Sequence, residues 1–334
     1  MSRRRTGDPP PDPFGERRRP AFTWAAPLLG ARVRFESDSA ELMQIVRDAF
    51  AGLPARRPRR STELTVRLVL GRAQRGQPTP LLPVSCPGMV GGVTAGSGLT
   101  AVVPRLRRAL VVVPRRLLRT PYHARYELIE FAVYLLAARC RGQVALHAAC
   151  VAGSSGGALL LGNSGAGKST LTLAAAAAGL RLLAEDSVLV DPRALEATGI
   201  ATFLHLGRRT LRLIRPAALA RRLSRAPTIR RRSGAVKLEI DARAAGLPLA
   251  RAPLALAAVV FVSARPAGAG PLLHRLEAGQ AAMRLEAGQR YAARQPGWGR
   301  FLRAVSRLPA FELRRAAPAL QVEALRAALG SRRP

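Results

Sequence analysis

The segment from Gly162 to Ser169 constrains the fold of this chain more than any other. Its residues, GNSGAGKS, match the pattern G-x-x-x-x-G-K-[ST] at every fixed position. An apolar stretch at 157–161 precedes it, and an alanine-rich stretch at 168–178, ended by Gly179, follows it. A strand, a glycine-rich turn and a helix in this order are typical of a phosphate-binding loop, whose backbone N–H groups and helix N-terminus surround an anion. The sequence therefore predicts a P-loop in an α/β domain.

Each residue type of this loop has a chemical role. Lys168 would reach the β- and γ-phosphates of a nucleoside triphosphate, and the Ser169 hydroxyl would ligate Mg²⁺. ATP, or another nucleoside triphosphate, and Mg²⁺ are therefore the predicted cofactors. The predicted nucleotide-binding residues are Gly162, Asn163, Ser164, Gly165, Ala166, Gly167, Lys168, Ser169 and Thr170.

Two adjacent carboxylates, Glu185 and Asp186, follow the loop in a strand predicted over 180–190. A triphosphate site requires an acid near its metal ion, and the long apolar strand predicted over 254–263 contains none. Neighbouring residues of a strand point to opposite faces. Both acids can serve one site only if the backbone bends, so that one approaches Mg²⁺ and the other orients or deprotonates an attacking hydroxyl. A chance pair of acids is the alternative interpretation.

Three segments resemble the catalytic domain of HPr kinase/phosphorylase, a bacterial serine kinase. They are LHAACV around His147, the loop GNSGAGKST, and GLRLLAEDSVLVD, and the resemblance covers about residues 144–191, with a possible extension to 263. It implies that Glu185 performs acid/base chemistry on the substrate serine and that Asp186, with the loop serine, holds Mg²⁺. The catalytic residues would then be Glu185, Asp186 and Lys168, and the metal ligands Ser169 and Asp186.

The sequence also departs from that family. The family's strand ends Ala-Asp-Asp where this chain has Ala184-Glu185-Asp186, and the family's helix continues with Glu where this chain has Thr170. The family's later signature segment is not found, and the N-terminal region is not recognisably the same. We therefore expect a kinase related to this family, not the HPr enzyme itself.

Further residues could contact substrate or phosphate. Lys168 and Lys237 are the only lysines in a chain with 54 basic residues. An ammonium and a guanidinium are not interchangeable in a tight space, which favours a role for Lys237. The basic segment leading to it, with Arg231 and Arg232, could clamp phosphates or an acidic substrate; a solvated loop is the alternative. His147 corresponds to the family's histidine near the site, and a core histidine is the alternative.

Charge and cysteine content restrict the partners and the compartment. The formal net charge of +34 would favour nucleic acid or an anionic membrane. The arginines are spread along the whole chain, so we expect non-specific affinity and no specific nucleic-acid partner. Cys86, Cys140 and Cys150 fit neither a disulfide framework nor a zinc site, which favours a cytoplasmic location. No apolar run reaches the ~18 residues of a membrane-spanning helix.

Three regions are predicted along the chain. They are a basic, proline-rich, disordered tail over 1–25, a small α+β domain over 26–120, and a kinase-like domain over 121–334 with a helical C-terminal part. A helix over 121–142 would bridge the two domains. The other predicted elements are a helix over 39–53, a loop over 74–98, strands over 31–35, 64–70, 99–103, 109–113, 143–152, 157–161, 201–206, 210–214, 236–241 and 311–314, and helix surface at the repeats 275–280 and 284–289.

These features together predict an ATP-dependent kinase. It would transfer the γ-phosphoryl group to a serine-like hydroxyl of a protein, peptide or small molecule, which the 26–120 domain would recognise. Two alternatives stay open: a P-loop ATPase or nucleotide-dependent regulatory protein without an acceptor, and a nucleotide-gated module that binds nucleic acid. The sequence does not identify the acceptor, and it is compatible with a homo-oligomer.

Overall fold

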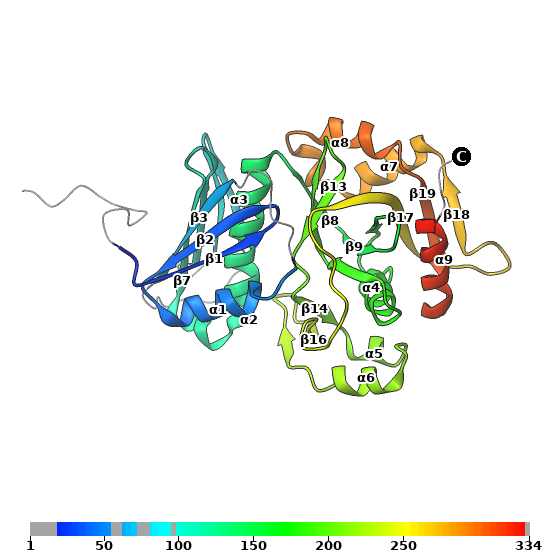
Figure 1. The fold of residues 1–334 in the computed structure, drawn as a ribbon, viewed down its shortest axis with the longest axis horizontal. Coiled ribbons are helices and arrows are strands. Elements are labelled where there is room, and N and C mark those ends of the chain that lie inside the picture. Colours follow the sequence, from blue (N-terminus) through cyan, green and yellow to red (C-terminus); the bar gives the residue numbers. More distant parts are fainter. Residues whose placement is uncertain (1–18, 55–61, 72–80, 95–97, 331–334) are drawn as a thin grey trace, which may run out of the picture.

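Helix α3 (Phe131–Arg141) lies between two sheets in the computed structural model of this protein (Figure 1). The structure describes residues 19–54, 62–71, 81–94 and 98–330. The helix contacts β3, β6 and β7 of the first sheet and β8 and β12 of the second, whose bounds are given below. The chain is therefore a mixed α/β protein whose two sheets meet at this helix.

The first sheet has the strand order β1-β2-β3-β7-β6-β5-β4, in which β2, β3 and β7 run parallel. Its elements are β1 (Phe22–Leu28), β2 (Ala31–Ser37), α1 (Ala40–Phe50), β3 (Glu63–Gly71), β4 (Leu82–Cys86), β5 (Met89–Thr94), β6 (Gly98–Val103), η1 (Pro104–Leu106), β7 (Arg108–Pro114) and η2 (Arg115–Arg119). Phe35 of β2 stacks on Phe50 of α1. Ser39 caps α1 by accepting a hydrogen bond from the Leu42 N–H at 3.3 Å.

Strand β1 corrects the predicted extent of the tail. It begins at Phe22, inside the range 1–25 assigned to a disordered tail, and pairs antiparallel with β2 along its whole length. Leu29 and Gly30, with φ of 50° and 75°, turn the chain between the two strands. Residues 1–18 of the predicted tail lie outside the described residues.

A hairpin occupies part of the region 74–98 that was expected to be a loop. Strands β4 and β5 pair from Leu82 opposite Val93 to Cys86 opposite Met89. Every residue of β4 is exposed, so no apolar alternation marks this strand in the sequence. Residues 74–80 and 95–97 of that region lie outside the described residues.

The helical segment that begins at Pro121 belongs to the core of the first sheet. Its parts are α2 (Pro121–His123), the π-helical segment η3 (Ala124–Glu130) and α3. Gly142 follows in a left-handed conformation. Leu128 and Leu136 lie in the same buried cluster as Val33 of β2. The helix thus packs in the core of the first sheet, although the sequence assigned it to the region 121–334, and it also contacts the second sheet.

The second sheet carries the glycine-rich loop. Its strands follow the order β11-β9-β10-β17-β13-β12-β8, with β19 paired to β17 and β18 paired to β19. They are β8 (Val144–His147), β9 (Ala149–Ala152), β10 (Gly157–Leu161), β11 (Arg181–Ala184), β12 (Ser187–Asp191), β13 (Glu196–Gly199), β17 (Leu254–Pro266), β18 (Leu273–Leu276) and β19 (Ala310–Arg315). Strands β10, β17 and β19 run parallel. The loop therefore follows a strand that is paired on both sides.

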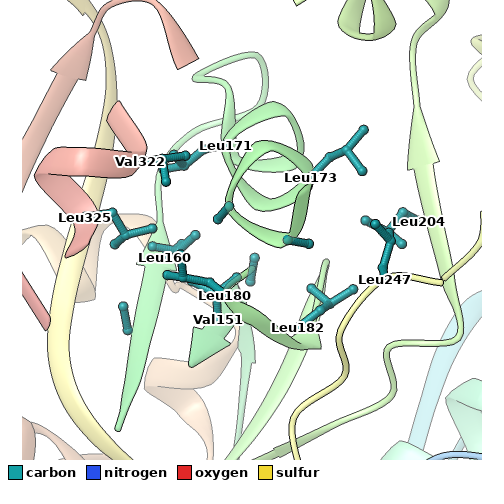
Figure 2. Close-up of a cluster of buried hydrophobic side chains, with 14 of the residues drawn as sticks. Val151, Leu160, Leu171, Leu173, Leu180, Leu182, Leu204, Leu247, Val322 and Leu325 are labelled. Carbon is teal, nitrogen blue, oxygen red and sulfur yellow. The ribbon is translucent and has the colours of Figure 1, made fainter. Parts of the chain in front are cut away.

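Helices cover both faces of this sheet. They are α4 (Lys168–Ala177), α7 (Ala278–Gly288), η4 (Ala292–Arg294), α8 (Trp298–Val305) and α9 (Pro318–Gly330). Leu160 of β10 lies in a cluster with Leu171 of α4 and Leu325 of α9 (Figure 2), whereas Leu159 and Leu161 lie in the cluster that contains α7 and α8. No helix of the described ranges is long and apolar enough to cross a membrane.

A small third sheet of order β14-β16-β15 lies below helix α4 in Figure 1, with two short helices beside it, and β14 contacts α4. The elements are β14 (Phe203–Leu206), α5 (Arg208–Leu211), α6 (Ala217–Leu223), β15 (Thr228–Arg230) and β16 (Val236–Asp241). The strand predicted over 210–214 is wrong, because α5 and a turn occupy this range. Leu211 and Ile214 are buried while Leu213 is exposed, which is a helical spacing.

The two RLEAGQ repeats have different structures. The copy at 275–280 runs from the end of β18 into the start of α7, and the copy at 284–289 covers the end of α7. Leu285 and Gln289 of the second copy are buried. The expectation of helix surface is therefore correct for only part of the repeat.

Candidate functional site

The glycine-rich loop joins the buried end of β10 to the first turn of α4. Gly162, Gly165 and Gly167 have φ of 148°, 81° and 103°, a backbone that residues with a Cβ rarely adopt. A methyl group on Gly162 would also overlap the carbonyl oxygen of Val262 in β17. At Gly165 and Gly167 a Cβ would meet nothing within 4 Å. The loop is therefore pressed against β17 where it starts and open where it approaches α4.

Lys168 folds back over this loop. Its Nζ donates a hydrogen bond to the carbonyl oxygen of Gly162 at 2.6 Å, and the residue is buried. Burial lowers the pKa of Lys168, while Asp186 and Glu185 act to raise it. The ammonium group thus lies near the loop and both acids, where the oxygens of a bound phosphate could replace the Gly162 carbonyl as its partner.

Glu185 and Asp186 lie where the chain bends between β11 and β12. Strand β11 pairs with β9, whereas β12 pairs with β8 and β13, so the backbone leaves one part of the sheet and enters another at these residues. The bend allows both acids to face one site, as the predicted division of roles requires. Glu185 is buried. Burial and the neighbouring Asp186 raise the pKa of Glu185, while its interaction with the Ser169 side chain acts to lower it.

Asp186 is held by two side chains. Its Oδ1 lies 3.1 Å from His147 Nδ1, and its Oδ2 accepts a hydrogen bond from the Tyr126 hydroxyl at 2.8 Å. Burial alone would raise the pKa of Asp186, but these bonds and the charge of Arg231 outweigh it and lower that pKa. The bond to Asp186 raises the pKa of His147. The side chain of His147 contacts Asp186 and is 59% exposed, so it is not a core histidine.

Gln289 and Gln295 fix the free edge of β8. Gln289 accepts the His147 N–H through Oε1 and donates to the His147 carbonyl through Nε2, both at 2.9 Å. Gln295 does the same for Ala145, at 2.9 and 3.0 Å. The two amides thus replace a neighbouring strand, and Gln289 fixes the backbone that carries the His147 ring.

The two arginines of the basic segment before β16 have different surroundings. Arg232 forms hydrogen bonds with both carboxylate oxygens of Glu127 at 2.8–3.0 Å, so it is tied to helix η3. Arg231 lies with its guanidinium 5.9 Å from the centre of the Tyr126 ring, and its Nε is buried without a hydrogen-bond partner. The pKa of Lys237 is lowered, because burial and the charge of Arg231 outweigh the opposing effect of Glu185 and Asp186. The structure thus brings Arg231 and Lys237 towards the acids and leaves Arg232 committed elsewhere.

Helix η3 supplies site residues that the sequence prediction missed. Besides Tyr126, its Arg125 forms ion pairs with Glu130 and with Glu239 of β16. His205 of β14 lies 3.3 Å from Glu239 through Nε2. These residues form a charged network next to the small cavity that Glu185 and Asp186 line. No local pattern in the sequence relates residues so far apart along the chain.

Two larger cavities adjoin the site. One of about 600 Å³ lies at the start of the glycine-rich loop and is lined by Gly162, Asn163 and several arginines, including Arg284. The other, of about 290 Å³, lies beside His147 and is lined mostly by apolar atoms. Nucleotide and acceptor would each require such a space next to the reacting groups.

The residues present fit a magnesium ion held together with a nucleotide. Within the part of the chain that the structure describes, no three or more His, Cys, Asp or Glu side chains gather as they do around a protein-held metal ion. Ser169 and Glu185, which lie close enough to interact, offer hard oxygen ligands. Mg²⁺ is commonly held by one or two protein oxygens and completed by water and phosphate, so these two groups suffice.

Comparisons with known proteins leave the relationship open. No protein-family model matches the chain, and no curated protein matches it. Among solved structures, the HPr(Ser) kinase/phosphatase from Coxiella burnetii is similar to 55% of this chain and 88% of its own, with 14% identity and a TM-score of 0.27. A superposition this loose does not establish a shared function.

Proposed function

We propose that this protein is an ATP-dependent phosphotransferase that moves the γ-phosphoryl group of ATP to a serine-like hydroxyl on a protein, peptide or small molecule. The arrangement of loop and acids carries the proposal. Lys168 donates a hydrogen bond to the Gly162 carbonyl within the glycine-rich loop, and Glu185, next to Asp186, interacts with Ser169 at the loop's end. Phosphate ligands, a metal-binding oxygen and a carboxylate that orients a hydroxyl are the parts that phosphoryl transfer requires.

The loop side of the site would hold the nucleotide. The backbone amides from Gly162 onwards and Lys168 would contact the β- and γ-phosphates, and the open loop at Gly165 supports this role. Ser169 and Glu185 would hold Mg²⁺. When bound there, Mg²⁺ would neutralise charge on the phosphates.

Asp186 and His147 would face the acceptor. The acceptor oxygen would form a bond to the γ-phosphorus, the bond from that phosphorus to the bridging oxygen would break, and ADP would leave. The acceptor's proton would pass to the Asp186 carboxylate. Because the transition state is loose, orientation of the hydroxyl matters more than the strength of the base, so the lowered pKa of Asp186 is compatible with this role.

These roles reverse the assignment that the resemblance implies for the two acids. The pKa directions favour the resemblance, since the pKa of Glu185 is raised and that of Asp186 is lowered. The contacts of the two acids favour the reverse, since Glu185 interacts with Ser169, whereas His147 and Tyr126 already contact the two oxygens of Asp186. We give these contacts precedence because a cation at Ser169 would stabilise the Glu185 carboxylate and oppose the effect of burial.

Arg231 and Lys237 would stabilise the charge that develops during transfer. Both act on the protonation of the acids, and the Arg231 Nε has no hydrogen-bond partner although it is buried. A buried donor of this kind is costly unless a ligand oxygen satisfies it. A phosphate oxygen near Asp186 would do so.

The test is incubation of the purified protein with γ-labelled ATP and Mg²⁺, with and without host-cell extract. We expect label on an extract component with the unmodified protein and with Arg300→Ala, an exposed cation on α8, but not with Lys168→Ala. If free phosphate is released at the same rate without extract, the protein is an ATPase and not a kinase. Binding of ATP without release or transfer would leave a nucleotide-dependent regulatory protein.

A further inference from the structure

The apolar cavity beside His147 lies at the junction of the two sheets. Its walls come from helices η3 and α3 on one side and from β8 and β12 on the other. Leu135 and Ala138 belong to the helical wall, Ala145 and Leu189 to the strand wall, and Tyr291 lies in the lining while being exposed. The cavity therefore is a concave space that is open to solvent and has mainly aliphatic and aromatic walls.

Most of the polar residues that line this cavity already have partners within the protein. The hydroxyl of Tyr126 donates to Asp186, and the hydroxyl of Tyr134 donates to the Ser187 carbonyl and accepts the Ile200 N–H. Glu130 pairs with Arg125, and the Gln295 amide is bonded to Ala145. These groups therefore offer little to a polar ligand. The side chains of Arg139, Ser187 and Tyr291 also line the cavity, but most of its lining atoms are apolar, so the cavity would select an apolar group.

The cavity shares residues with the reacting centre. Tyr126 and His147 both line it, and both contact the Asp186 carboxylate. Tyr126 belongs to the π-helical segment η3, and π-helical turns are frequent at functional sites. A group that fills the cavity would therefore hold whatever it is attached to next to Asp186.

We propose that this cavity binds an apolar group of about the size of one aromatic ring, carried by the phosphoryl acceptor close to its hydroxyl. The inference rests on the proposed function, because it uses Asp186 as the group that faces the acceptor. The volume of about 290 Å³ admits a ring or a branched aliphatic chain and excludes a folded partner. The acceptor is thus an aromatic or aliphatic alcohol, or a serine beside a large apolar side chain.

The binding test uses 2-phenylethanol, an aromatic ring with a terminal hydroxyl, and saturation-transfer NMR without nucleotide. Ala145→Phe and Ala138→Leu fill the cavity from opposite walls. Ala101→Phe is the matched control, because Ala101 is a half-buried alanine in a strand that does not line the cavity. We expect the unmodified protein, Ala101→Phe and Lys168→Ala to bind the probe. Both cavity-filling variants should weaken binding about tenfold or more, because the space for the ring is lost.

A transfer assay separates this inference from the proposed function. We expect ATP-dependent formation of 2-phenylethyl phosphate to exceed that of ethyl phosphate from ethanol, and Ala145→Phe to abolish the difference. The inference is overturned if 2-phenylethanol does not bind, or if both cavity-filling variants bind it as tightly as the unmodified protein does, even if extract proteins are phosphorylated. Binding as expected, with no transfer to any acceptor, overturns the proposed function and with it the acceptor role of the cavity.

Discussion

The Nδ1 atom of His147 lies 3.1 Å from Oδ1 of Asp186. The two residues lie at the ends of two different strands. Strand β8 ends at His147 and β12 starts just after Asp186, and the two strands pair antiparallel with Ser187 opposite His147. The pairing of these two strands thus sets the distance between the His147 ring and the Asp186 carboxylate. The contact raises the pKa of His147 and contributes to lowering that of Asp186.

We predict that this pair stabilises the fold in a pH-dependent way. Because the pKa of His147 is raised on folding, its contribution is complete below the unfolded pKa of about 6.5 and is lost as pH rises through the folded pKa. Because the pKa of Asp186 is lowered, its contribution holds above about pH 4 and is lost in stronger acid. The unmodified protein should therefore have a higher free energy of unfolding than His147→Gln, and this difference should be largest near pH 5.5 and smallest near pH 9. These two pH values lie about one unit below and well above the unfolded pKa of histidine.

Urea denaturation of both proteins at these two pH values measures the difference. His274→Gln is the control for loss of a histidine outside the site. A difference that stays constant between the two pH values, or grows with pH, would show that the charged His147 does not stabilise Asp186 in the folded state.

The two acids should respond differently to substitution. Asp186→Asn should lower kcat for phosphoryl transfer by about 10²–10⁴-fold, because the acceptor loses its oriented proton acceptor, while the Mg²⁺ concentration for half-maximal activity changes little. Glu185→Gln should raise that Mg²⁺ concentration about tenfold or more, because a metal ligand loses its charge. Titration of Mg²⁺ at saturating ATP distinguishes the variants, and the opposite pattern would restore the assignment that the family resemblance implies.

The glycine-rich loop could be predicted because its chemistry is local. Gly162, Lys168 and Ser169 follow one another in a fixed pattern between an apolar strand and a helix, and the structure has that strand and helix. The break at Glu185 was also visible, since two carboxylates interrupt an apolar strand, and the structure bends there. In both places the residues that determine the geometry are close in the sequence, and the mixed α/β class follows from the same local patterns.

The partners of the acids could not be predicted in this way. Tyr126 reaches Asp186 from the preceding helix and Gln289 reaches His147 from the end of α7, and no periodicity relates such distant segments. Lys237 attracted attention only because lysine is rare in this chain. The wider network was invisible because it depends on how the three sheets pack, which local patterns do not determine.

Gly162 should be much less tolerant of a side chain than another left-handed glycine. Gly162→Ala combines φ of 148° with overlap against the Val262 carbonyl, whereas Gly179→Ala, at φ of 92°, meets nothing within 4 Å. We expect a loss of about 1 kcal/mol in the free energy of unfolding for Gly179→Ala and about 2–4 kcal/mol for Gly162→Ala. Urea denaturation at constant pH measures both, and equal losses would mean that β17 yields to the added methyl group.

Gln289 should act as a positioning residue for His147, in contrast to Gln295. Both amides make the same pair of hydrogen bonds to β8, so Gln289→Ala and Gln295→Ala should each lower the free energy of unfolding by about 1–3 kcal/mol. Only Gln289→Ala frees the backbone of His147, so only it should lower kcat at saturating acceptor, by about tenfold or more, with ATP binding unchanged. Parallel denaturation, ATP titration and transfer assays measure the three quantities. If both variants lower kcat equally, the amides serve only to cover the edge of β8, and the position of His147 does not depend on Gln289.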